Sequence, residues 1–264
     1  MSKISYKSLI QKKNNIPITC LTAYSKPLAK ILDGKVDLIL IGDSVGTTIY
    51  GMKNTRSVNI DMMKNHAKAV VKNTKNSMTI VDLPYNTYRN KREALKNANY
   101  ILRNTNADFI KIETDLKNVD IVKYLTDNNI KVVSHIGVTP QKYFDFSKIK
   151  SVGKDSKVSE KLISLAKTLE IAGSKLIILE CISTNTAKEI TKALSIPTIG
   201  IGASKYCDGQ VLVIDDLLNL DSESKKPKFV KNFINIEKFI LKAVEKYVKD
   251  VKKKKFPSNK NSYK

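Results

Sequence analysis

The sequence contains no tryptophan, only two histidines and only three cysteines among its 264 residues. The cysteines, Cys20, Cys181 and Cys207, are widely spaced and form no Cys-x-x-Cys pair, which argues against a structural zinc site or a disulfide framework. No His-x-x-x-His pair or His-rich segment supports a transition-metal site either. This cysteine usage favours a reducing compartment, and we expect the protein to be cytoplasmic.

Long apolar runs are also missing. No stretch of about 18 consecutive apolar residues occurs, so the sequence predicts no transmembrane helix and no membrane partner. The opening residues, MSKISYKSLIQKK, lack the apolar segment of a secretory signal. With 42% hydrophobic residues, the chain is nevertheless long enough to bury a large core in one barrel-sized domain.

Arginine is scarce although the net charge is +22, because only four of the 47 basic residues are Arg. Arg is the residue favoured for reading bases, and nucleic-acid-binding domains gather their charge in one patch. Here the lysines are spread over every expected helix, and no helix-turn-helix, zinc-finger or RNA-binding signature occurs. We therefore expect no nucleic-acid partner and attribute the abundant Lys, Asn and Ile to a low-GC codon bias. A non-enzymatic basic binding protein, with a steeply salt-dependent affinity, is the alternative.

Apolar runs alternate with amphipathic helical segments along the chain. Most of the runs lack strict polar alternation, which is typical of strands buried on both faces of a parallel sheet. The repeated order predicts an α/β fold, a (β/α)8 TIM barrel, as a single domain over residues 1–251, with a doubly wound open sheet as the alternative. The long connection 44–59 is expected to be a functional loop, and the basic tail 252–264 to be disordered. The expected strands span 18–24, 37–43, 78–84, 108–114, 131–137, 175–181, 196–203 and 210–216.

Acidic side chains lie at the ends of four expected strands. Lys111 and Glu113 are two residues apart in DFIKIET, so they point to the same face of one strand. Burying such a pair is unfavourable unless the two groups are paired with each other or take part in chemistry. A structural ion pair is therefore the alternative interpretation. Because TIM barrels carry their active sites at the C-terminal face, we expect one site there, formed by Asp43, Asp82, Glu113, His135 and Glu180.

The chemistry of these groups favours a hard cation. Clustered carboxylates without Cys or paired His suit Mg²⁺, which takes oxygen ligands and water, and Asp43 and Asp82 are the best candidate ligands. Lys111 would supply positive charge for an anionic substrate, and Ser44 would hydrogen-bond the same carboxylate. Glu180 ends an apolar strand, which suits it to general acid–base work, with a salt bridge to a Lys as the alternative. A metal, a lysine and a base together predict proton abstraction beside a carbonyl.

Other polar positions carry weaker signals. His135 is either an outer-shell hydrogen-bond partner or a satisfied core histidine, and His66 lies in an expected helix where it packs or caps. The glycine-rich stretch IGIGAS, 199–204, is only a weak phosphate-binding signal, because its glycines also allow close approach at the mouth of a barrel.

An ordered set of short segments resembles the ketopantoate hydroxymethyltransferase family. The segments run from about residue 18 to residue 233 and are LTAYS, LIGDSVG, IVDLPY, IKIE, SHIGVTPQ, LIILEC, IGIGAS with DGQVLV, and PKFVKN. The resemblance implies a Mg²⁺-dependent (β/α)8 enzyme of pantothenate synthesis. Such an enzyme transfers a hydroxymethyl group from 5,10-methylenetetrahydrofolate to 3-methyl-2-oxobutanoate through a Mg²⁺-stabilised enolate and gives 2-dehydropantoate.

The resemblance also implies roles for individual residues. Asp43 and Asp82 correspond to metal ligands, and Glu113 to a further metal contact through water. The oxoacid would contact Asp43, Ser44, Asp82 and Lys111, and Glu180 corresponds to the proton acceptor. The family further implies a homo-oligomer, typically a decamer.

The chain departs from the family pattern at several positions. Ser134 and Ser204 stand where the family usually has Gly, and Asp215 stands where His is common. The segment 142–154 is shortened, and 219–226 lacks the usual glycines. These departures leave the carboxylate set intact and concern the folate pocket and the lid loops. A lyase of the isocitrate lyase and phosphoenolpyruvate mutase type is a further alternative, but no cysteine here has the Lys-Lys-Cys-Gly-His context of that group.

Overall fold

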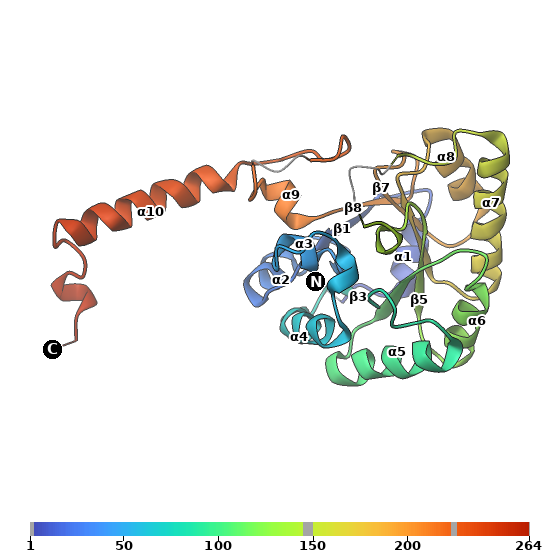
Figure 1. Cartoon of the computed structure of the whole chain (residues 1–264), viewed down its shortest axis with the longest axis horizontal. Helices are drawn as coiled ribbons and strands as arrows, with labels where there is room; N and C mark the ends of the chain where they lie inside the picture. The colour runs from blue at the N-terminus through green and yellow to red at the C-terminus, as the bar shows by residue number, and fades with distance from the viewer. Residues whose placement is uncertain (1–2, 145–149, 223–225, 264) are drawn as a thin grey trace. The chain divides into compact units, whose positions relative to one another are not determined.

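The computed structural model describes residues 3–144, 150–222 and 226–263. The chain divides into two compact units, Met1–Val213 and Ile214–Lys264. Among the described residues of the first unit, eight parallel strands pair in chain order and close into a barrel (Figure 1). This confirms the predicted (β/α)8 TIM barrel. The strands are β1 (Ile18–Thr22), β2 (Leu38–Ile41), β3 (Met78–Asp82), β4 (Phe109–Glu113), β5 (Val132–Gly137), β6 (Leu176–Glu180), β7 (Thr198–Ile201) and β8 (Gly209–Leu212).

Helices follow the strands and cover the outside of the barrel (Figure 1). Polar side chains define where several of them begin: Asn59, Asn90 and Asp155 each accept a hydrogen bond from a backbone N–H of the following first turn. The helices of this unit are α1 (Tyr6–Lys12), α2 (Lys26–Leu32), α3 (Val45–Thr48), α4 (Ile60–Val71), α5 (Lys91–Thr105), α6 (Val119–Asp127), α7 (Ser156–Ile171) and α8 (Thr184–Ala193), with the 3-10 turns η1 (Thr55–Ser57) and η2 (Pro140–Lys142).

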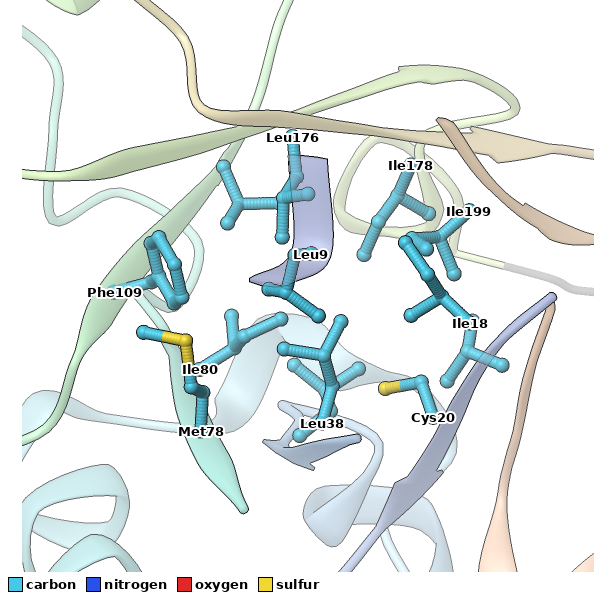
Figure 2. Packing of buried hydrophobic residues seen from close by; sticks show 13 residues of the cluster. Leu9, Ile18, Cys20, Leu38, Met78, Ile80, Phe109, Leu176, Ile178 and Ile199 are labelled. Carbon is cyan, nitrogen blue, oxygen red and sulfur yellow. The ribbon is translucent and has the colours of Figure 1, made fainter. Parts of the chain in front are cut away.

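Helix α1 closes the N-terminal end of the barrel. Its Leu9 is fully buried and lies among the first residues of the strands, beside Leu38, Phe109 and Leu176 (Figure 2). The lower half of the barrel is therefore a packed apolar core, and a substrate has access only from the opposite, C-terminal end.

Hydrogen bonds between Asp and Thr join neighbouring strands at the same N-terminal end. In each case the backbone N–H and the hydroxyl of a Thr donate to one carboxylate oxygen of the Asp that precedes the next strand in the barrel. The pairs are Thr19–Asp37, Thr79–Asp108 and Thr198–Asp208. Lys13, which follows α1, adds a buried ion pair of 2.8 Å to Asp208. Ionic groups at this end therefore stabilise the barrel rather than form a site.

The chain after β8 differs from the expected pattern. Strand β8 ends at Leu212, not at 216, because Asp215 and Asp216 lie in the first turn of α9 (Ile214–Leu218), where acidic side chains favour a helix. The expected loop 44–59 likewise contains α3 and η1. The structure places α9 and α10 (Ile236–Lys252) in a unit of their own, whereas the sequence pattern predicted a single barrel domain over residues 1–251. Disorder of the tail 252–264, which contains η4 (Asn259–Asn261), stays a prediction.

Helix α10 carries apolar side chains that remain exposed, among them Phe239, Leu241, Val244, Tyr247 and Val251. Throughout the part of the chain that the structure describes, no helix has both the length and the apolarity needed to cross a membrane.

Candidate active site

The interior face of the barrel changes from apolar to charged toward the C-terminal ends of the strands. Side chains two residues apart along a strand share a face, so the core residue Ile80 is followed by Asp82, and Ile178 by Glu180. On β4, the core residue Phe109 is followed by Lys111 and then by Glu113. The carboxylates stand on this face at the height where the sequence predicted a site, directly above the packed core.

Strand register places Lys111 beside Asp82. The two residues are partners in the β3–β4 pairing, and Lys111 Nζ lies 2.9 Å from Asp82 Oδ1. The other oxygen, Asp82 Oδ2, accepts a hydrogen bond of 3.1 Å from the backbone N–H of Asp43. Asp43 follows β2 by two residues, so β2, β3 and β4 together bring these three predicted residues into one buried group.

Burial and mutual repulsion shift the pKa values of this group. Burial, together with the charge of Asp82, raises the pKa of Asp43 to about 7. Burial and the charge of Asp43 raise the pKa of Glu113 well above its ordinary value. Burial alone would lower the pKa of Lys111, but the charges of Asp82, Asp43 and Glu113 outweigh burial and raise it. Lys111 therefore stays cationic, and an added cation would relieve the repulsion among the carboxylates.

His135 lies between two of the predicted carboxylates. Its Nε2 is 3.2 Å from Glu180 Oε2 and its Nδ1 is 4.0 Å from Glu113 Oε1, although neither contact has hydrogen-bond alignment. Burial and the charge of Lys111 lower the pKa of His135, so the imidazole is neutral. Because neither ring nitrogen has a hydrogen-bond partner among the described residues, His135 is not a satisfied core histidine, and its role as an outer-shell partner stays a prediction. The Glu180 side chain is 16% exposed, against 4% for Glu113, so it is the carboxylate that a substrate can reach.

Ser44 lies at the rim of this group. Its hydroxyl is 2.7 Å from the Tyr24 hydroxyl. A Cβ placed on Gly42 would lie 2.9 Å from Ser44 Oγ and 3.7 Å from Asp82 Oδ2, so both side chains flank the glycine closely. Because position 42 has no side chain, Ser44 and Asp82 can lie this close to the backbone. Both residues were predicted to contact the oxoacid.

Gln141 is a residue of this site that the sequence pattern did not predict. Gln141 lies in η2, after β5, and its Nε2 donates a hydrogen bond of 2.8 Å to Asp43 Oδ2. Its backbone N–H donates to Glu113 Oε1 at 3.1 Å. Tyr88 donates its hydroxyl hydrogen to Gln141 Oε1. Gln141 closes the segment SHIGVTPQ, which was used only to establish the resemblance, and that position was the available signal.

Arg56 was also missed. Its guanidinium lies 3.7 Å from the centre of the Tyr85 ring and 4.1 Å from that of Phe144, and its Nη1 donates a hydrogen bond of 2.8 Å to the Gln141 carbonyl. Planar stacking between two rings suits Arg better than Lys. This contact joins the loops that follow β2, β3 and β5. His66, by contrast, bonds the Tyr24 carbonyl and the Tyr50 hydroxyl and lies outside the carboxylate group.

The donor chemistry fits Mg²⁺, although the site is not preassembled. Across residues 3–144, 150–222 and 226–263, no three His, Cys, Asp or Glu side chains converge as a ready metal site. Mg²⁺, however, usually keeps several waters and uses one or two carboxylates. Asp43 and Asp82 would supply these oxygens. Glu113 Oε2, which is buried and has no hydrogen-bond partner among the described residues, would accept from a metal-bound water.

Two of the departures from the family pattern, Ser134 and Ser204, make hydrogen bonds outside the carboxylate group. Ser134 is buried, and its hydroxyl is 2.6 Å from that of Ser174, so the replacement of glycine introduces no unpaired polar group. Ser204 Oγ accepts from the Tyr206 backbone N–H. Within the altered segments 142–154 and 219–226, residues 145–149 and 223–225 lie outside the described residues.

The fold and the site define a class of protein: a (β/α)8 barrel enzyme with a lysine and several carboxylates at the C-terminal ends of its strands. A family model described as ketopantoate hydroxymethyltransferase matches residues 3–259. The chain therefore belongs to the ketopantoate hydroxymethyltransferase family, as the resemblance implied, and is an enzyme of the hydroxymethyltransferase class.

Individual relatives agree over nearly the whole chain. The 3-methyl-2-oxobutanoate hydroxymethyltransferase of Pelagibacter ubique is 47% identical over 256 residues, which cover 97% of this chain and 98% of the relative. That of Syntrophomonas wolfei is 40% identical over 96% of this chain and 92% of the relative.

Among solved structures, a 2,3-dimethylmalate lyase of the PEP mutase/isocitrate lyase superfamily has a TM-score of 0.60 at 12% identity, with 96% of this chain and 89% of that one covered. A phosphonopyruvate hydrolase has a TM-score of 0.59 at 10% identity, with 99% and 93% covered. At these identities the likeness concerns the fold alone.

Proposed function

We propose that the protein transfers a hydroxymethyl group from 5,10-methylenetetrahydrofolate to 3-methyl-2-oxobutanoate and forms 2-dehydropantoate. Family membership supports the reaction class and the oxoacid. The rest is supported by the composition of the site. The buried Lys111 interacts with the carboxylates of Asp82, Asp43 and Glu113, and Glu180 lies beside His135 in the same group. Such a site holds a cation and an anionic substrate together and still leaves a base free.

The oxoacid carboxylate is negatively charged, and Lys111 supplies a fixed positive charge that Asp82 holds in place at 2.9 Å. Ser44, which directly follows Asp43 in the chain, adds a hydroxyl that would hydrogen-bond the same carboxylate. Mg²⁺, when bound by Asp43 and Asp82, would supply the positive charge that stabilises an enolate oxygen. Lys111 and Ser44 thereby orient the substrate so that its C3 hydrogen faces Glu180.

Glu180 is the base in this account. It takes the proton from C3 of the oxoacid, and the electron pair of that C–H bond becomes available for a new C–C bond to the one-carbon unit. His135 is neutral beside Glu180, so it does not neutralise the carboxylate before the proton is transferred. Because the donor carries its carbon as a methylene bridge between two nitrogens, both carbon–nitrogen bonds break and tetrahydrofolate leaves. Water supplies the oxygen of the new hydroxymethyl group, and the C3 proton together with one proton of that water goes to the two nitrogens.

We also propose that the protein is cytoplasmic and forms a homo-oligomer. Its cysteines are free and buried, which suits a reducing compartment. The exposed apolar side chains of α10 support association with further copies, since such surfaces are unfavourable in water. The decamer expected from the family stays a prediction.

A product assay tests the proposed function. The purified protein is incubated with Mg²⁺, 3-methyl-2-oxobutanoate and 5,10-methylenetetrahydrofolate, and 2-dehydropantoate is detected by mass spectrometry. We expect product only when both substrates and the metal are present. Asp120→Asn, which removes an exposed carboxylate on α6, should retain full activity and serves as the matched control. A folded protein that makes no 2-dehydropantoate under these conditions contradicts the proposal.

A further inference from the structure

Gln141 is only 2% exposed, and each of its polar groups forms a hydrogen bond within the protein. Its side-chain Nε2 donates to Asp43 Oδ2 at 2.8 Å and to the Leu83 carbonyl at 3.1 Å. Its side-chain Oε1 accepts from the Tyr88 hydroxyl. Its backbone N–H donates to Glu113 Oε1, and its carbonyl accepts from Arg56. One residue thus contacts the loops or strand ends of β2, β3 and β4.

The surroundings of Gln141 fix the orientation of its side-chain amide. Asp43 Oδ2 and the Leu83 carbonyl are both acceptors, so they require the NH₂ end of the amide. The Tyr88 hydroxyl donates and therefore requires the oxygen end. Burial and the charge of Glu113 raise the pKa of Tyr88 well above its ordinary value, so its hydroxyl keeps the proton that it donates. A flipped amide would set an oxygen against two acceptors and is excluded.

We propose that Gln141 is a positioning residue for the carboxylates that hold the cation. By engaging Asp43 Oδ2 and Glu113 Oε1, it determines which oxygen of each carboxylate remains for the metal and its water. For Glu113 the remaining oxygen is Oε2, the atom that is buried without a hydrogen-bond partner among the described residues. The metal part of this inference rests on the proposed function.

A purely structural role for Gln141 would be to fasten the η2 turn to the barrel. The backbone contacts already do so, because the N–H bonds Glu113 and the carbonyl bonds Arg56 whatever the side chain is. Among the described residues, the side chain hydrogen-bonds Asp43, Leu83 and Tyr88. A side-chain substitution therefore separates positioning of Asp43 from attachment of the turn.

The test measures metal binding directly, with Mn²⁺ as the probe. Free Mn²⁺ is followed by electron paramagnetic resonance during titration of the wild type and of Gln141→Met, which keeps a similar length but has no amide. Partners one shell beyond a metal typically contribute about 10–100-fold to its affinity, and we expect a loss of at least about tenfold at this site. Turnover at saturating Mg²⁺ should fall by a smaller factor than the affinity.

Tyr88→Phe provides a second variant that changes less. Its hydroxyl donates its hydrogen bond to the Gln141 amide oxygen and not to Asp43, so we expect a smaller loss of Mn²⁺ affinity in the single variant. No additional loss is expected when Tyr88→Phe is combined with Gln141→Met. A residue that merely fills space would not show this coupling. Gln210→Met is the matched control, since the Gln210 amide donates to the Ser204 carbonyl, outside the carboxylate group. The Mn²⁺ affinity of this variant should equal that of the wild type.

The outcomes distinguish this inference from the proposed function. If the wild type binds Mn²⁺ and both the Gln141 and Tyr88 variants bind it equally well, the positioning role is wrong while the function stands. If Gln141→Met does not fold, Tyr88→Phe alone decides, because unchanged affinity in that variant overturns the inference. If the wild type itself binds no Mn²⁺, the metal part of the proposed function fails and the inference fails with it.

Discussion

Lys111 and Asp82 form an ion pair of 2.9 Å between the neighbouring strands β3 and β4, with both side chains more than nine-tenths buried. The pair follows directly from strand register, since the two residues are partners in the pairing of these strands. Asp82 offsets the charge of Lys111, which leaves Asp43, Glu113 and Glu180 in excess. This imbalance is the physical basis for expecting a bound cation at the mouth of the barrel.

Replacement of Glu180 by Gln should reduce turnover while oxoacid binding largely persists. The amide keeps the size of the side chain but cannot accept the C3 proton, and loss of a general base typically lowers rates by about 10²–10⁴-fold. Steady-state kinetics and calorimetric titration of 3-methyl-2-oxobutanoate measure the two effects separately. Normal turnover in this variant would remove Glu180 from the mechanism.

Replacement of Asp82 by Asn should sharply increase the Mg²⁺ concentration needed for half-maximal activity. The amide has one carboxylate oxygen fewer for the metal, and it leaves the buried Lys111 without its ion-pair partner. A Mg²⁺ titration of activity measures the change, with Asp120→Asn as the control for loss of one negative charge. A metal titration that matches the wild type would count against Asp82 as a ligand.

Raising the pH should destabilise the metal-free protein through Asp43. Burial and the charge of Asp82 raise the pKa of Asp43 from 3.8 to about 7. Between these values the folded state binds more protons than the unfolded state, so the free energy of unfolding falls as the pH rises. We expect the contribution of Asp43 to the thermal midpoint to decrease between about pH 5 and about pH 7.5 and saturating Mg²⁺ to reverse the decrease.

Asp43→Asn isolates this contribution. His135, whose pKa is lowered, acts in the opposite direction below its ordinary pKa of 6.5, but it is present in both proteins. The thermal midpoint of the wild type, measured relative to that of Asp43→Asn, should therefore fall as the pH rises. A difference that is constant over this pH range would show that Asp43 has no raised pKa.

Replacement of Asp208 by Ala should destabilise the barrel without affecting the site. The change leaves the buried Lys13 without its ion-pair partner, and both hydrogen bonds from Thr198 are lost. Breaking a buried pair on one side is typically destabilising by about 3–5 kcal/mol. Denaturant unfolding measures the loss. The exposed Asp120→Ala should change stability by less than about 1 kcal/mol, and an equal effect of the two would contradict this account of the N-terminal end.

The sequence was sufficient to predict the barrel and the group of carboxylates, because both follow from local patterns. Apolar strands alternate with helices, and the position of a side chain on a strand determines its face and height, which is why Asp82, Lys111 and Glu113 were found together. The predicted end of β8 was wrong because the apolar run continues from β8 into the short helix α9. An apolar run of this length does not distinguish a strand from the start of a helix.

Gln141 and Arg56 were missed for a different reason. Their importance depends on contacts across about 85 residues of sequence, such as Arg56 with the Gln141 carbonyl, and no local pattern reveals which loops meet at the barrel mouth. A neutral glutamine also has no charge that marks it as out of place. The partial exposure of Glu180 likewise depends on how neighbouring loops are arranged around it.

The most direct test of the account is exchange of the C3 proton of 3-methyl-2-oxobutanoate in D₂O, followed by NMR with Mg²⁺ present and the folate omitted. The account predicts exchange that requires Mg²⁺ and is lost in Glu180→Gln, because the metal, the oxoacid contacts and the base are all that proton removal needs. Exchange that continues unchanged in Glu180→Gln, or no exchange in the folded wild type even after the folate is added, would contradict it.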